Sequence, residues 1–79
     1  MFQYMESKIA DLLNKIIQAR KERGITQKEL SIMSGVSYST MTKLESGIIK
    51  SPSFAAIYKI IKALDMTFDE LIENRGHKQ

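Results

Sequence analysis

Three glycines, Gly24, Gly35 and Gly47, divide the first part of the sequence into short segments, each with apolar residues at helical spacing. Glycine readily adopts the left-handed backbone conformation that often ends a helix. A chain interrupted in this way at short intervals forms several short helices that bury their apolar faces against one another. The pattern therefore predicts an all-α fold, and no segment reads convincingly as a β-strand.

The first three helices have recognisable ends. Apolar residues at i, i+3, i+4, i+7 and i+8 predict a helix from about residue 8 to residue 23, with Ser7 as its cap. Thr26 and Glu29 form a capping-box pattern that opens a second helix, ending near residue 34. Ser37 is a good N-cap for a third helix, which reaches about residue 46.

Two more helices follow a loop that contains Pro52. Ser53 is expected to cap the fourth helix, and Asp65 to end it in the left-handed conformation. Thr67 and Glu70 repeat the capping-box pattern and open the fifth. The residues expected to face the core are Ile9, Leu12, Leu13, Ile16, Ile17, Leu30, Val36, Met41, Leu44, Phe54, Ile57, Ile60, Ile61, Leu64, Phe68, Leu71 and Ile72.

The length of 79 residues fits one small domain. We expect an apolar N-terminal arm at residues 1–6, a helical domain at 7–74 and a polar tail at 75–79. The net charge is +3, and residues 15–50 carry seven lysines and arginines against three glutamates, whereas residues 65–73 carry only acidic charges. This asymmetry suggests a polyanion as partner, although an ordinary mixed surface explains it equally well.

The composition argues against several classes of protein. There is no cysteine, and the single histidine, His77, lies in the polar tail. No apolar run approaches the roughly 18 residues of a membrane span, and the N-terminus lacks the pattern of a signal peptide. There is no nucleophile–base pair, metal-ligand cluster or glycine-rich phosphate loop. We therefore expect no enzyme activity, no cofactor, no metal, no membrane association and a cytoplasmic location.

The segment GVSYSTMTKLESG, residues 35–47, poses the functional question, because a packed helix rarely carries so many small hydroxyl side chains. Val36, Met41 and Leu44 suit its inner face. The outer face is then left to Tyr38, Ser39, Thr42 and Lys43.

The sequence TQKELSIMSGVSYSTMTKLESG, followed by a proline-containing loop and FAAIYKIIKALDMTFDELI, resembles the Cro and XRE-like helix-turn-helix family of phage and bacterial repressors. The resemblance extends from about residue 9 to residue 73. It implies a compact five-helix, lambda-repressor-like DNA-binding domain, in which the second and third helices form the helix-turn-helix.

The resemblance also implies roles for individual residues. Base reading falls to Tyr38, Ser39, Thr42 and Lys43, and phosphate binding to Gln27, Ser37, Thr40, Ser46 and Lys50. Arg20 and Glu45 match a structural ion pair, and the dimer interface of relatives corresponds to Tyr58, Met66, Phe68 and Ile72. Alternatively, Ser39 and Thr40 are solvent-facing, and Arg20 and Glu45 are unrelated surface charges. Relatives often carry Gln, Arg or Asn at the position of Tyr38, which leaves open whether Tyr38 reads a base or contacts the backbone.

The resemblance predicts a bacterial or phage-encoded, nucleoid-associated regulator that recognises a short inverted repeat in double-stranded DNA as a homodimer. Two alternatives are an antitoxin, which binds its operator and a toxin protein, and a protein-interaction module that no longer reads DNA.

Overall fold

The first helix is longer than its apolar pattern predicts. A computed structural model describes the backbone of residues 2–72 and the side chains of residues 8–71, and helix α1 spans Phe2–Glu22. Residues 2–6, assigned above to an arm, form its first turns, and Ser7 lies inside it, so the prediction of Ser7 as the cap was wrong. No glycine or proline interrupts residues 2–7, and extending a helix costs far less than starting one. The predicted tail and the side chain of Ile72 lie outside the described residues.

The second and third helices begin and end where their local signals predict. Helix α2 spans Gln27–Ser34, and its capping box is complete: the Thr26 hydroxyl accepts from the Glu29 amide, and the Glu29 carboxylate accepts from the Thr26 amide. Helix α3 spans Tyr38–Ser46, with the Ser37 hydroxyl accepting from the Thr40 amide at 3.1 Å. These caps confirm the predicted starts of both helices.

The last two helices, α4 at Phe54–Ala63 and α5 at Phe68–Ile72, also follow their caps. The Ser53 hydroxyl accepts from the Ala56 amide, and Thr67 and Glu70 form the second capping box. Asp65 has a φ of 58°, which confirms the predicted left-handed stop between the helices. Residues 2–72 thus contain five helices and no strand.

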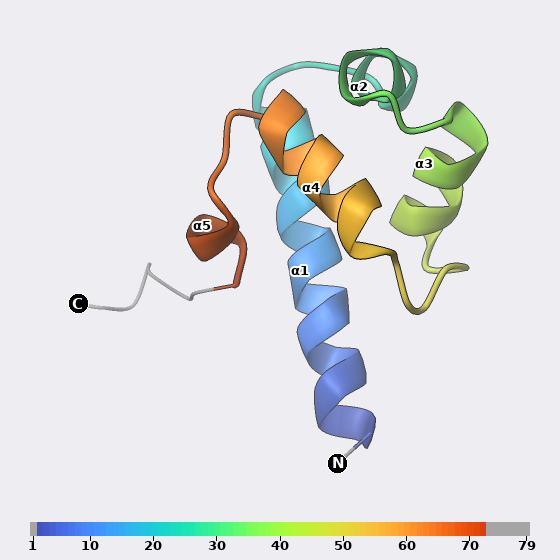
Figure 1. Cartoon of the computed structure of the whole chain (residues 1–79), viewed down its shortest axis with the longest axis vertical. Helices are drawn as coiled ribbons and strands as arrows, with labels where there is room; N and C mark the ends of the chain where they lie inside the picture. The colour runs from blue at the N-terminus through green and yellow to red at the C-terminus, as the bar shows by residue number, and fades with distance from the viewer. Residues whose placement is uncertain (1, 73–79) are drawn as a thin grey trace.

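The core lies between α1, α4 and the inner faces of α2 and α3. In Figure 1, α2 and α3 lie on one side of α1 and α5 lies on the other. Most of the predicted apolar residues are buried: Leu13, Ile16, Leu30, Val36, Met41, Leu44, Ile57, Ile60, Ile61, Leu64 and Leu71. Phe54 and Phe68 are corrections, since 68% of Phe54 and 39% of Phe68 are exposed. Each is the first residue of its helix, and their rings pack on each other rather than in the core.

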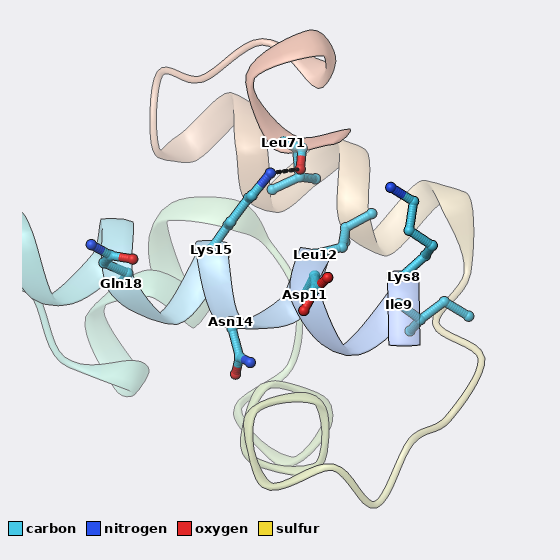
Figure 2. Close-up of a pocket in the computed structure, with 8 residues that line it drawn as sticks. All are labelled: Lys8, Ile9, Asp11, Leu12, Asn14, Lys15, Gln18 and Leu71. Atoms are coloured by element: carbon cyan, nitrogen blue, oxygen red, sulfur yellow. Dashed lines mark hydrogen bonds between the residues drawn. The ribbon is translucent and has the colours of Figure 1, made fainter. Parts of the chain in front are cut away.

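Helix α5 is too short to be stable alone, and α1 holds it from the side (Figure 2). The Lys15 ammonium, on α1, donates to the carbonyl oxygen of Leu71 at 3.1 Å. A lysine at this end of a helix satisfies a carbonyl that has no helical partner. Beside this contact, a pocket along α1 is lined by both polar and apolar side chains. No helix among the described residues is long and apolar enough to cross a membrane.

Candidate nucleic-acid interface

The turn between α2 and α3 fixes the angle between the two helices. Gly35 ends α2 with a φ of 82°, a backbone conformation that residues with a Cβ rarely adopt. The Val36 side chain is buried, and its amide donates to the Ser34 hydroxyl at 3.1 Å. Met41 and Leu44 then anchor the inner face of α3 in the core. The third helix is therefore held rigidly, with its other face outward.

The outer face of α3 carries the four predicted base-reading residues. Tyr38, Ser39 and Lys43 are exposed, whereas Thr42 is half-buried. The Thr42 hydroxyl donates to the Ser39 carbonyl at 2.9 Å, so its oxygen lone pairs and its methyl group remain for a partner. Within the described part of the chain, neither the Lys43 ammonium nor the Ser39 hydroxyl has a hydrogen-bond partner or an ion pair. The helix thus offers both donors and acceptors.

The residues predicted to bind phosphate lie at both ends of α3. At its start, the Ser37 hydroxyl donates to the Thr40 hydroxyl at 2.9 Å, which leaves the Thr40 proton available. At its end, the Ser46 hydroxyl donates to the Lys43 carbonyl at 3.3 Å. Lys50 follows in the loop and is exposed. The two groups are separated by the length of the helix, an arrangement that suits contacts with both sides of a groove.

Arg20 and Glu45 form an ion pair that connects α1 with α3. Arg20 Nε and Nη2 donate to the two Glu45 carboxylate oxygens at 2.7 and 2.8 Å, and Arg20 Nη1 donates to the Ile25 carbonyl at 2.8 Å. The two side chains are only 11% and 7% exposed. The geometry is bidentate, which is the strongest arrangement of this pair.

The Glu45 carboxylate also accepts a hydrogen bond from Gln27, a residue to which the family resemblance assigns phosphate binding. Gln27 Nε2 donates to Glu45 Oε1 at 2.9 Å, so this amide is directed into the protein. Gln27 is the first residue of α2, and its backbone N–H, like those of any first helical turn, has no partner within the helix. If Gln27 binds a phosphate, this backbone group is the one that remains available for it.

These contacts determine the protonation of Glu45. Burial raises its pKa, but the hydrogen bonds from Arg20 and Gln27 outweigh burial and hold the pKa below its ordinary value. The hydrogen bonds that Arg20 donates to Glu45 raise the pKa of Arg20. Both groups are therefore charged at neutral pH, and their charges cancel.

Two carboxylates of this region, those of Glu45 and Glu29, thus already have partners within the protein. Glu45 is paired with Arg20, and Glu29 is held by the start of its own helix. The Arg20–Glu45 pair is neutral as a unit, so the remaining charges around α3 are mostly those of lysines. The described residues contain no group of histidines and carboxylates that is able to hold a metal ion.

One contact on this surface does not follow from the sequence pattern. The Lys28 ammonium, on α2, lies over the Tyr38 ring, 5.9 Å from its centroid. Tyr38 is the first residue of α3 and is 49% exposed. No spacing rule relates residues on the two sides of a turn, so the sequence did not predict this contact. Its only signal was a tyrosine at a position where relatives often carry Gln, Arg or Asn.

The residues predicted at a dimer interface lie elsewhere, on α4, on α5 and in the connection between them. Phe54, Tyr58 and Phe68 form an exposed aromatic cluster, in which the Phe54 ring centroid lies 6.3 Å from that of Tyr58 and 5.8 Å from that of Phe68. Met66 packs against the core from a half-buried position. An apolar groove lined by Ile9, Leu12, Pro52 and Ile57 adjoins the cluster.

Comparison with known proteins agrees with this architecture. The helix-turn-helix family profile matches residues 16–71. The chain is 32% identical over 62 residues to an uncharacterized HTH-type transcriptional regulator, RghRB, of Bacillus subtilis (strain 168), covering 78% of this chain and 45% of the relative. It is 32% identical over 63 residues to the HTH-type transcriptional regulator SlrR of the same organism, covering 78% of this chain and 41% of the relative.

A third relative is matched over most of its own length. It is an uncharacterized HTH-type transcriptional regulator, y4dJ, of Sinorhizobium fredii (strain NBRC 101917 / NGR234), 34% identical over 53 residues, which are 67% of this chain and 68% of the relative. The chain spans less than half the length of the two Bacillus relatives. No solved structure matches the chain.

Proposed function

Since the chain belongs to the XRE-like helix-turn-helix family, we propose that it is a cytoplasmic transcriptional regulator that binds double-stranded DNA by sequence. One observation carries the proposal. The outer face of α3 holds a lysine and a serine with no partner within the described residues, while the nearby glutamates are occupied. A helix of this kind fits the major groove, which is about 12 Å wide.

In this proposal α3 enters the groove and its four outer residues meet base edges. Lys43 donates to the O6 and N7 atoms of guanine, and Ser39 donates or accepts. Thr42 already gives its proton to the Ser39 carbonyl, so it contributes its methyl group to thymine or its oxygen to an amino group. The short side chains of Ser39 and Thr42 let the helix backbone approach the bases.

Phosphate contacts hold the helix in register without reading sequence. The N-terminus of α2 supplies the backbone N–H of Gln27, and the Ser37 and Thr40 hydroxyls lie at the start of α3. Lys50 contacts the backbone beyond the other end, and Ser46 joins it when its hydroxyl turns from the Lys43 carbonyl to a phosphate. Arg20 neutralises Glu45, so that the carboxylate does not repel the DNA.

We further propose that two copies bind a short inverted repeat as a homodimer and repress transcription from it. The exposed aromatic cluster supports pairing through α4 and α5, because exposed aromatic residues of this size are typical of protein interfaces. Charges of both signs lie beside the cluster: the Lys62 ammonium lies 5.8 Å from the centroid of the Tyr58 ring, and Asp69 follows Phe68 on α5. In a two-fold pairing, the basic edge of one copy is able to meet the acidic edge of the other.

Selection of duplexes from a random pool tests the proposal, since it reports sequence preference, symmetry and half-site spacing together. We expect an inverted repeat whose half-sites lie about 34 Å apart. Binding to the selected duplex should weaken steeply with salt, with log K against log salt falling by about 0.9 for each phosphate neutralised. Recovery of no preferred sequence would refute sequence reading.

The exposed apolar residues Ile32, Met33 and Ile48 favour a second candidate, a protein partner such as the toxin of an antitoxin pair. In that case these residues are the contact surface. Pull-down with Ile32→Glu as bait, compared with the unchanged protein, tests this idea without DNA. A partner retained equally by both baits would exclude Ile32 from the contact.

A further inference from the structure

We infer that Lys28 is a positioning residue for Tyr38, and that the two together set the base preference at the start of α3. The inference rests on the proposed DNA-binding function. It starts from a contact between the two helices of the motif: Lys28 is the second residue of α2, Tyr38 is the first residue of α3, and the ammonium lies 5.9 Å from the ring centroid. This distance is within the range of cation–π attraction.

Tyr38 needs such a contact because the core does not hold it. About half of the side chain is exposed, and it makes no hydrogen bond within the described residues. A tyrosine in this situation rotates about two side-chain bonds and loses that freedom when it binds. An ammonium over the ring removes part of the freedom in advance.

Helix α2 gives Lys28 a rigid base from which to act. Its capping box is complete, and Gln27 beside Lys28 is bonded to Glu45. In addition, the Ser31 hydroxyl donates to the Lys28 carbonyl at 2.7 Å. The direction of the Tyr38 ring is therefore coupled to the frame of α1, α2 and α3.

The position of the pair separates the two possible roles of Tyr38. The first helix of such a motif crosses the DNA backbone, and the N-terminal residues of the second contact base edges. Lys28 then lies on the phosphate side and Tyr38 on the groove side. Because the ammonium covers one face of the ring, Tyr38 is left with its hydroxyl, its ring edge and its other face to meet a base pair.

The contact is testable in the free protein, without DNA. Protons above an aromatic ring resonate upfield, so the Lys28 side-chain methylene protons next to the ammonium should be shifted upfield in the NMR spectrum. The shift should vanish in Tyr38→Leu and persist in Tyr38→Phe. Methylene protons at their ordinary position in the unchanged protein would overturn the inference, whether or not the protein binds DNA.

Duplex selection then tests the consequence for sequence preference. Lys28→Met keeps the aliphatic stem and removes the charge, whereas Lys28→Arg keeps a cation over the ring. We expect Lys28→Met to lose about two- to fivefold of the discrimination at one base pair of each half-site, and Lys28→Arg to retain it. Tyr38→Leu should affect the same base pair, and adding Lys28→Met to it should have no further effect there.

Lys50→Met is the matched control, because it removes a charge from the proposed phosphate contacts without a ring partner. It should weaken all sequences alike and reduce the salt slope by about 1. If Lys28→Met gives that same uniform loss, Lys28 is only a phosphate contact and the inference fails while the proposed function stands. If the unchanged protein selects no sequence at all, the proposed function fails first.

Discussion

The Glu45 carboxylate, on α3, accepts two hydrogen bonds from the guanidinium of Arg20, near the end of α1. Arg20 Nε and Nη2 donate to its two oxygens at 2.7 and 2.8 Å. Arg20 also binds the carbonyl of Ile25 in the turn before α2, and Gln27 of α2 donates to the same carboxylate. One carboxylate therefore connects three helices at the place where the motif must hold its shape. This role in connecting the helices explains why α3, which is proposed to face phosphates, carries a glutamate.

We predict that Glu45→Ala destabilises the fold by on the order of 3 kcal/mol, because it leaves the largely buried Arg20 without its partner. Urea denaturation measures the loss. Glu29→Ala is the control, since its carboxylate serves only an exposed capping box and should cost about 1 kcal/mol. Similar costs for both substitutions would show that the ion pair contributes little.

The same pair predicts how stability depends on pH. The pKa of Glu45 is lower in the folded protein than in the unfolded chain, so its contribution is complete above the unfolded pKa. That contribution is lost as the pH falls from there through the folded pKa. The melting temperature of the unchanged protein should therefore decrease more between pH 5 and about pH 3 than that of Glu45→Gln, in which the group does not titrate. Parallel curves would contradict this assignment.

Gly35→Ala should destabilise the protein by about 1–2 kcal/mol, because φ at this position is 82° and a Cβ disfavours that conformation. No atom lies within 4 Å of the site a Cβ would occupy, so crowding adds nothing. Gly35→Asn should cost less, since asparagine tolerates the left-handed region. Thermal melting of both variants checks the order, and an alanine variant as stable as the parent would exclude conformational strain.

Local signals explain why most of the fold was predictable from the sequence. Thr26 with Glu29, Ser37 and Ser53 each satisfy amides within their own first turn, so these helix starts depend on neighbouring residues alone. The start of α1 had no such signal, because residues 2–7 contain no glycine or proline that would interrupt the helix. Phe54 was misassigned for a related reason. Helical spacing shows that Phe54 lies on the apolar face of its helix, but the contact of its ring with Phe68 depends on where α5 lies.

The candidate site was predictable only in part. The family resemblance supplied the Arg20–Glu45 pair and the outer residues of α3. It did not predict that the Gln27 amide is directed to Glu45, or that Lys28 lies over Tyr38. Both contacts depend on the angle at which α2 and α3 meet, which no periodicity along one helix contains.

Lys43→Ala should weaken binding to the selected duplex by about 1–3 kcal/mol and relax the preference at one base pair. The reason is that Lys43 is an exposed cation on α3 with no partner in the described chain. Titrations of the selected and a random duplex measure the effect. Lys50→Ala should weaken both duplexes alike, and the same result for Lys43→Ala would remove it from the base-reading set.

If the proposed homodimer forms through α4 and α5, Tyr58→Lys should shift the protein from dimer to monomer without unfolding it, because about half of this side chain is exposed in the single chain. Loss of a central interface aromatic costs about 2 kcal/mol or more, which raises the dimer dissociation constant about 30-fold. Sedimentation without DNA measures the change. Ile32→Lys is the control, since Ile32 is exposed on α2 and is not part of the aromatic cluster, and its substitution should leave association unchanged. If the unchanged protein sediments only as a monomer at high concentration, the aromatic cluster is not a dimer interface.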